Sequence, residues 1–259
     1  MAPISPTQYW KLDEVSGNRS PSVGTITLTD NNTVGSRGGI RNLAADFITA
    51  NDEYLSSADH ADLSIGDRDW SMALWVCLDD AASAVIIGKD DGGGNREYRL
   101  HRDGASFVWL ARNVANTATV QAGAAHAGQD VLQFVVCDHD ATGNNIGVTV
   151  NAGARGQVAI AGVRDSNNAW LIGSPTGSAW DYFNGGIDEI GIWPGYLLTS
   201  DDRTYLYNGG AGRTYPPSGG GYMSWWFYAN KWKDFLRDLK KGLVAPGELQ
   251  RRYGQLLAI

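Results

Sequence analysis

The sequence predicts an all-β fold, an antiparallel sandwich of two sheets, followed by a short helical tail. Short apolar runs recur at intervals of about ten residues, which is the spacing of strands in a sandwich. Gly accounts for 33 of the 259 residues and charged residues for only 19%. That balance is typical of many short strands joined by Gly-rich turns. A chain of this length can bury the core of one sizeable domain.

In the first part of the chain we expect five strands, over residues 8–12, 26–28, 46–48, 53–55 and 70–78. Asp46-Phe47-Ile48 and Glu53-Tyr54-Leu55 are predicted to pair as a hairpin around Ala50-Asn51-Asp52. Trp70–Leu78 is a nearly unbroken apolar run, and its length and flanks indicate a strand in the core of the sandwich.

In the second part we expect seven strands, over residues 85–89, 98–102, 106–110, 132–137, 146–151, 170–173 and 186–193. Asp103-Gly104 predicts a tight hairpin between two of them. One short helix is predicted over 200–207, with Ser200 as its cap and two acidic residues in its first turn. Gly209-Gly210 is expected to end it.

A change of composition marks a boundary near residue 216. Residues 222–259 hold 7 Lys or Arg against 3 Asp or Glu, a net charge of +4, whereas the rest of the chain carries −11. Between them, Pro216–Gly221 has the composition of a linker. We therefore predict a sandwich over 1–215, a Pro/Gly linker over 216–221 and an amphipathic helical tail over 222–259.

Bulk properties exclude several classes of function. The net charge of −7 argues against nucleic-acid binding, which needs a basic surface. No apolar stretch approaches the roughly 20 residues of a membrane span. The residues after Met1 do not form a secretory signal, so we expect synthesis in the cytoplasm without a signal peptide. Cys77 and Cys137 lie inside apolar runs, which favours buried free thiols over a disulfide.

Several motifs occur in the order typical of one family. Near the C-terminal end they are Gly185–Trp193, Leu198-Thr199 and Leu206–Gly210. Near the start they are Tyr9–Glu14, Ser16-Gly17, Asp46-Phe47, Asp52–Leu55 and Trp70–Val76. Over residues 8 to about 215 the chain resembles laminin G-like, concanavalin A-like domains. The resemblance implies a jelly roll of two packed sheets that often holds calcium and often binds sugars or protein surfaces.

The resemblance makes Asp188 the best candidate for a calcium ligand, since hard cations prefer carboxylate and carbonyl oxygens. The family's first loop commonly brings an Asp where this chain has Ser20-Pro21-Ser22. Asp138 and Asp140, with Asn144, form an acidic stretch that is either a second calcium site or a solvated loop.

Catalysis is not expected. Hydrolases on this scaffold place two carboxylates on one face of a strand, which needs acidic residues at alternate positions. No such run occurs, and the adjacent Asp188 and Glu189 are predicted to point to opposite faces. The sequence therefore predicts a protein that is not an enzyme.

A loop before the last strand offers a candidate ligand site. Trp180, Asp181 and Tyr182 follow a Ser/Pro/Gly-rich stretch. An exposed Trp beside an Asp stacks on a sugar ring and hydrogen-bonds its hydroxyls. The alternative is that Trp180 folds over the edge of the sandwich and closes the core.

The tail carries an apolar stripe at helical spacing, with basic and acidic residues on its other face. Its predicted partner-binding residues are Trp225, Trp226, Trp232, Leu236, Leu239 and Leu243. Such a helix must bury its stripe. We expect it to dock on a protein partner or a second copy of the chain. The alternatives are packing on its own sandwich and, less favoured, lying on a membrane surface.

The sequence thus predicts a non-enzymatic structural or binding module. Its make-up resembles phage structural proteins that carry laminin G-like domains. We therefore expect a capsid decoration or fibre-associated protein on the virion surface, docked on a larger assembly by its tail. The alternative is a lectin-like, carbohydrate-binding module of a surface or exported protein, with Trp180 and its neighbours as the platform.

Overall fold

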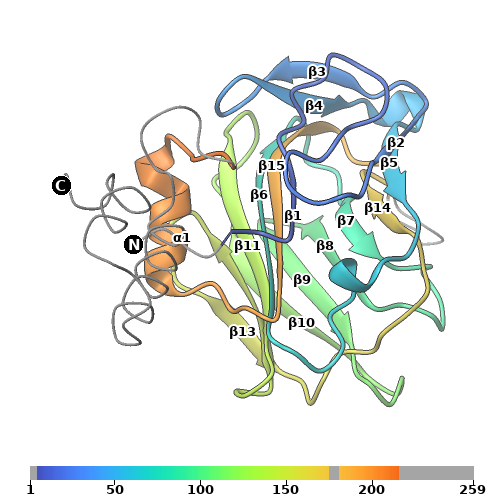
Figure 1. The fold of residues 1–259 in the computed structure, drawn as a ribbon, viewed down its shortest axis with the longest axis vertical. Helices are drawn as coiled ribbons and strands as arrows, with labels where there is room; N and C mark the ends of the chain where they lie inside the picture. The colour runs from blue at the N-terminus through green and yellow to red at the C-terminus, as the bar shows by residue number, and fades with distance from the viewer. Residues whose placement is uncertain (1–4, 175–180, 216–259) are drawn as a thin grey trace, which may run out of the picture. The chain divides into compact units, whose positions relative to one another are not determined.

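The computed structural model describes residues 5–174 and 181–215. Two antiparallel sheets pack face to face, which confirms the predicted jelly-roll sandwich (Figure 1). By its internal contacts the chain divides between Pro216 and Pro217. The predicted linker and tail lie outside the described residues.

The first sheet has eight strands. In spatial order they are β13 (Gly156–Ala159), β12 (Asn145–Val150), β11 (Gln133–Asp140), β6 (Trp70–Leu78), β15 (Gly185–Pro194), β4 (Leu43–Phe47) and β3 (Gly35–Gly38), with β1 (Gln8–Trp10) also paired to β15. At its centre, every residue of β6 and all but the last of β15 are buried. These two strands are therefore covered on both faces.

The second sheet has seven strands. In spatial order they are β10 (Thr119–Ala125), β9 (Ser106–Arg112), β8 (Tyr98–Asp103), β7 (Val85–Lys89), β14 (Trp170–Ile172), β5 (Tyr54–Ser57) and β2 (Thr29–Asn31). The predicted hairpin at Asp103-Gly104 joins β8 to β9, and Gly104 takes the positive φ of +55° that the tight turn needs.

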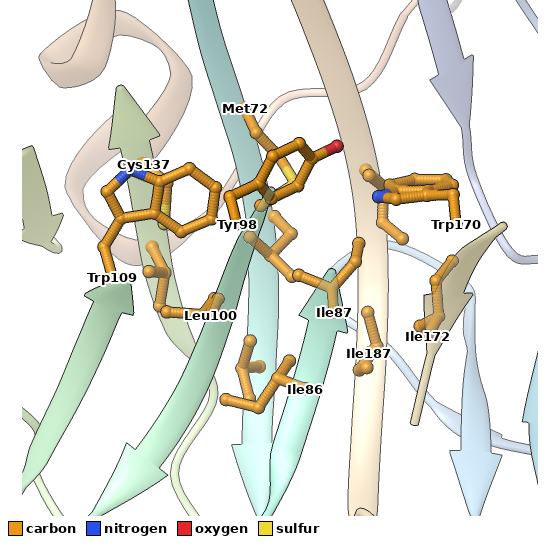
Figure 2. Packing of buried hydrophobic residues seen from close by; sticks show 14 of the residues in the cluster. Met72, Ile86, Ile87, Tyr98, Leu100, Trp109, Cys137, Trp170, Ile172 and Ile187 are labelled. Carbon is orange, nitrogen blue, oxygen red and sulfur yellow. The ribbon is translucent and has the colours of Figure 1, made fainter. Parts of the chain in front are cut away.

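The main core fills the space between the sheets. Figure 2 shows Met72, Cys137 and Ile187 from the eight-stranded sheet meeting side chains from the seven-stranded sheet. Among the latter are the rings of Trp109 and Trp170. Both cysteines are buried and free, as predicted.

A second apolar layer covers the outer face of the eight-stranded sheet. The helix α1 (Ser200–Tyr207) lies there (Figure 1). Its Leu206 joins a cluster that contains Tyr9, Trp75 and Trp193. No described helix is long and apolar enough to cross a membrane.

The helix prediction is confirmed in its bounds but wrong in its cap. Thr199, not Ser200, is the N-cap: its hydroxyl accepts from the Asp202 N–H, and the Asp202 carboxylate accepts from the Thr199 N–H. This reciprocal arrangement is a capping box. The helix ends at Asn208 in a left-handed conformation, one residue before the expected glycines.

Other predictions about strands are wrong. Asp46-Phe47 and Tyr54-Leu55 do not pair as a hairpin, because β4 bonds to β15 in one sheet and β5 to β14 in the other. The 3₁₀ helix η1 (Thr49–Asn51) carries the chain across between them. The strand expected at 26–28 lies at 29–31. The sequence pattern also missed β3, β10 and β13, which are rich in Gly, Ala and polar residues.

Lys89, at the end of β7, is fully buried in a polar network that holds three loops together. Its ammonium lies 3.0 Å from Glu97 Oε2 and 2.6 Å from Asp59 Oδ1. It also donates to Ser64 Oγ and to the Ser166 carbonyl, each at 2.7 Å. All of its donors are therefore used, which is the condition under which a buried charge is tolerated.

Replacing Lys89 by Met is expected to lower the free energy of unfolding by about 3–5 kcal/mol, because it leaves the Glu97 carboxylate buried without its cation. Urea denaturation measures the loss. Asp59→Asn is the control, because the Asp59 side chain is 39% exposed and its removal costs less than about 1 kcal/mol. Equal losses in the two variants would contradict this account.

Candidate functional site

Two tyrosines lie together on the outer face of the seven-stranded sheet. Leu55 belongs to the core, so its neighbour in β5, Tyr54, points to the outer face. Tyr182 lies outside the strands, and its ring contact with Tyr54 places it on the same face. The two tyrosine rings lie 6.3 Å apart between centroids and are tilted by 44°. Both residues are half-buried. An aromatic surface is thus open to solvent on this face.

Polar and apolar side chains extend this surface. Asn31 is directly opposite Tyr54 in the sheet, and Ser56 is opposite Leu171, so all four side chains share the outer face. The Asn31 amide donates to Ser56 Oγ at 3.0 Å. We call the set Tyr54, Tyr182, Leu171, Asn31 and Ser56 the tyrosine face; each member is half-buried.

The backbone beneath the tyrosine face is fixed from several sides. The Thr49 hydroxyl donates to the Tyr182 carbonyl at 2.5 Å, and the Phe183 N–H donates to the Gly173 carbonyl at 3.0 Å. Gly173 has a φ of +85°, and a Cβ there would lie 2.7 Å from the Phe47 ring. The backbone that carries the two tyrosines is therefore held by hydrogen bonds and close packing.

The predicted ligand residues fall on or near this face. Tyr182 is part of it, and Asp181 is exposed beside it, where its N–H donates to the Ser83 carbonyl at 3.4 Å. Trp180 lies outside the described residues. Tyr54 is not among the residues that the sequence predicts for a ligand site. The alternation around Tyr54 indicates a strand, but its face depends on the pairing of β5 with β14, which the predicted hairpin with 46–48 does not contain.

Asp188 and Glu189 form a second cluster, on the outer face of the eight-stranded sheet. The prediction that they point to opposite faces is wrong, because β15 bulges after Asp188 and Glu189 takes a φ of +53°. The extra residue places both carboxylates away from the core, while the flanking Ile187 and Ile190 point into it. The two carboxylates are buried, at 1% and 4% exposure.

Burial dominates the electrostatics of this pair. It raises the pKa of Asp188 to about 8, with a further contribution from the charge of Glu189. It raises the pKa of Glu189 to about 7, against a hydrogen bond from the Tyr9 hydroxyl that lowers it. Asp188 Oδ2 accepts from the Ile40 N–H at 2.8 Å, whereas the buried Oδ1 has no partner among the described residues.

The predicted calcium ligands are not gathered into one site. Both oxygens of Asp138 accept from the Arg155 guanidinium, and Asp140 accepts from the Gly143 N–H in its own turn. Within residues 5–174 and 181–215 no group of three or more His, Cys, Asp or Glu side chains could hold a metal ion. The buried, unpartnered oxygen of Asp188 is the one feature that favours a cation there, so calcium stays a prediction.

A small polar pocket lies elsewhere on the sandwich. It has a volume of about 260 Å³ and is lined by Ser64, Ile65, Asp67, Arg68 and Asp165, among others. The Arg68 guanidinium donates to the Ala61 and Ser64 carbonyls at 2.5 and 2.6 Å. No aromatic side chain lines this pocket, so it lacks the stacking surface that the tyrosine face offers.

Residues 49–202 match the family model of the concanavalin A-like lectin/glucanases superfamily, of the laminin G type. No curated protein sequence matches the chain.

Solved structures share the fold at low sequence identity. The binding domain of Paraclostridial Mosquitocidal Protein 1 has a TM-score of 0.62 at 8% identity, over 79% of this chain and 52% of that one. The botulinum neurotoxin serotype D ligand binding domain, in complex with N-acetylneuraminic acid, has a TM-score of 0.62 at 10% identity over 79% and 51%. The chain thus spans about half the length of these toxin domains.

A third similar structure is matched over nearly its whole length. Domain 4 of AbnA, an extracellular arabinanase from Geobacillus stearothermophilus, was solved in complex with arabinotriose. It has a TM-score of 0.59 at 16% identity, over 78% of this chain and 97% of that one. These likenesses establish the fold.

The raised pKa values of Asp188 and Glu189 predict a pH-dependent stability. Between pH 4 and 8 these two carboxyl groups bind more protons in the folded than in the unfolded chain, so their contribution to stability falls as the pH rises. The measurement is the change in the free energy of unfolding in urea, with a chelator present, from pH 5 to pH 9. We expect this change to be more negative in the wild-type chain than in an Asp188→Asn/Glu189→Gln variant, by more than about 1.4 kcal/mol, the equivalent of one pKa unit.

A variant and wild type that follow the same pH curve would contradict this expectation. Repeating the measurement with calcium in place of the chelator tests the calcium prediction. Calcium bound at Asp188 stabilises the folded chain by mass action, and the Asp188→Asn substitution removes that gain.

Proposed function

The chain belongs to the concanavalin A-like lectin/glucanases superfamily, and from that premise we propose that it is a non-enzymatic binding module that holds a carbohydrate on its tyrosine face. Membership alone leaves the function open, because one fold serves many functions. The proposed function therefore rests on the side chains of the tyrosine face.

The observation that carries it is the half-exposed pair of Tyr54 and Tyr182 beside the Asn31 amide and the Ser56 hydroxyl. A pyranose or furanose ring offers an apolar C–H surface that packs on an aromatic ring, and hydroxyls at its rim that need hydrogen-bond partners. Among the described residues neither tyrosine hydroxyl has a hydrogen-bond partner. The face thus supplies both kinds of contact.

The ligands of two similar structures support this use of the scaffold. One of them is a domain solved with arabinotriose and another is a domain solved with N-acetylneuraminic acid. Their sugars belong to those proteins, and their identity to this chain is too low to carry over a binding residue.

The burial of Asp188 and Glu189 supports a non-enzymatic role, because it argues against catalysis by this pair. Asp188 and Glu189 are the carboxylates that the bulge brings to one face, which is the arrangement a glycosidase needs. They are almost fully buried, and the Tyr9 hydroxyl bonds to Glu189. A glycosidic bond cannot reach them without opening this layer of the fold.

The second part of the proposal concerns attachment. We propose that residues 222–259, with their apolar stripe, dock the sandwich on a larger assembly as a capsid decoration or fibre-associated protein at a virion surface. The supporting observation is the sequence itself, where the stripe and a change of net charge both follow the linker. Docking on a protein partner and pairing with a second copy both remain within this proposal, and a membrane surface is the less favoured alternative.

Truncating either tyrosine to Ala is expected to weaken glycan binding by at least about tenfold, because each variant removes stacking area from the same sugar. The measurement is calorimetric titration with oligosaccharides that bind the full chain in a glycan-array screen. Tyr205→Ala is the matched control, because Tyr205 is also half-buried but lies on α1 over the other sheet. The proposal fails if no glycan binds, or if the control loses as much affinity.

Light scattering tests the attachment. We expect the full chain to form a larger particle, or to join one when mixed with its assembly, and a chain ending at Ser218 to remain a monomer. The physical reason is that an apolar stripe in water is stabilised by burial against a partner. Identical behaviour of both chains, alone and with virion components, would contradict the docking role.

A further inference from the structure

We propose that the tyrosine face selects neutral sugars and rejects sugars that carry a carboxylate, such as sialic acids and uronic acids. This rests on the proposed carbohydrate-binding function and specifies its ligand class. It follows from the sign and the availability of the charged groups around Tyr54 and Tyr182.

The exposed charges nearest to the face along the chain are negative. Asp181 immediately precedes Tyr182 and is exposed. Asp52 ends η1, two residues before Tyr54, and is exposed as well; its carbonyl accepts from the Asn32 amide at 2.8 Å. Each charge lies one or two residues from a tyrosine in the chain, so a ligand carboxylate on the face would be within about the 10 Å over which charges interact at 0.1 M salt.

Glu53 adds a third negative group beneath the face. It is 3% exposed, and its two oxygens accept from the Ile48 N–H at 2.9 Å and the Asn51 amide at 2.8 Å. Neither donor carries a positive charge. The negative charge of Glu53 is therefore not compensated by a cation within these contacts.

The guanidinium groups of neighbouring strands are already committed to acceptors. Arg99 shares the outer face, since Leu171 is opposite Gly88 and Gly88 is opposite Arg99. It is only 5% exposed and donates to Asp90 at 3.1 Å. Arg19, beside β2 in the fold, is fully buried and donates to the carbonyls of Val34 and Gly35.

Recognition of a sugar carboxylate ordinarily uses an accessible Arg in a two-bond, charge-assisted contact. The described residues around the tyrosine face supply carboxylates in its place. A neutral sugar meets no such repulsion, because its hydroxyls donate to and accept from Asn31, Ser56 and the tyrosine hydroxyls. The carboxylates near the tyrosine face thus lower its affinity for acidic glycans by repulsion, and salt screens this repulsion.

The test is a titration of the full chain with matched sugars. The probes are N-acetyllactosamine and its sialylated form, with arabinotriose as a second neutral sugar and a linear oligogalacturonate as a second acidic one. We expect the neutral member of each comparison to bind at least about tenfold more tightly at low salt. The ratio of the two dissociation constants should narrow at high salt.

Substitutions of the charged residues test whether Asp52 and Asp181 cause the preference for neutral sugars. Asp52→Asn suits the left-handed φ of +54° at this position and removes one charge without removing a member of the tyrosine face. It is expected to narrow the neutral-to-acidic ratio several-fold, and Asp181→Lys to narrow it further. Asp201→Asn, an exposed carboxylate on α1 over the other sheet, is the control and should leave the ratio unchanged.

The outcomes separate this inference from the proposal beneath it. Tyrosine-dependent binding that is equal or tighter for the acidic sugars overturns the proposed charge selectivity while leaving carbohydrate binding intact. The proposed charge selectivity is also overturned if the ratio of the dissociation constants for acidic and neutral sugars changes neither with salt nor with the Asp52→Asn substitution. Binding of no sugar in either class overturns the proposed function and this inference together.

Discussion

The burial of β6 and β15 on both faces is the constraint on which the rest of the structure depends. A strand covered on one side only alternates apolar and polar residues, but these two are apolar along nearly their whole length. The core between the sheets covers one face. The other face needs a second layer, which α1 and the cluster around Tyr9, Trp75 and Trp193 provide.

This second layer also explains the bulge in β15. Asp188 and Glu189 interrupt an apolar strand at its centre, and a regular strand would send one of them into the core. The bulge turns both outwards, where Tyr9 and the Ile40 N–H supply hydrogen bonds. β1 and the loop at Ile40 are thereby tied to the middle of the sheet, in a layer whose stability depends on the protonation of two carboxyl groups.

The sequence predicts strands and turns that depend on a local pattern of residues. It does not predict which strands pair when they lie far apart in the chain. The apolar runs at Trp70–Leu78 and Gly186–Trp193 and the Asp103-Gly104 turn identify their strands without further information. β4 pairs with β15, whose residues lie over 130 positions further along the chain, so the local pattern favours a hairpin with 53–55 instead. For the same reason the sequence does not show which face Tyr54 lies on, because that face is set by the pairing of β5 with β14. Nothing in the residue types around Glu189 predicts its left-handed φ, and so the bulge in β15 could not be predicted from the sequence.

The second layer occupies the outer face of the eight-stranded sheet at its centre. A partner can therefore reach β6 and β15 from that side only by displacing Leu206, Trp193 and their neighbours. The seven-stranded sheet keeps half-exposed side chains at β2, β5 and β14, and there two tyrosines stand over a backbone fixed by hydrogen bonds. A rigid aromatic surface that the fold leaves open costs little to keep in place and gains most when a ligand covers it. Under the proposed function, the packing that closes the centre of one sheet leaves the tyrosine face as the surface for recognition, and the carboxylates near it select the ligands.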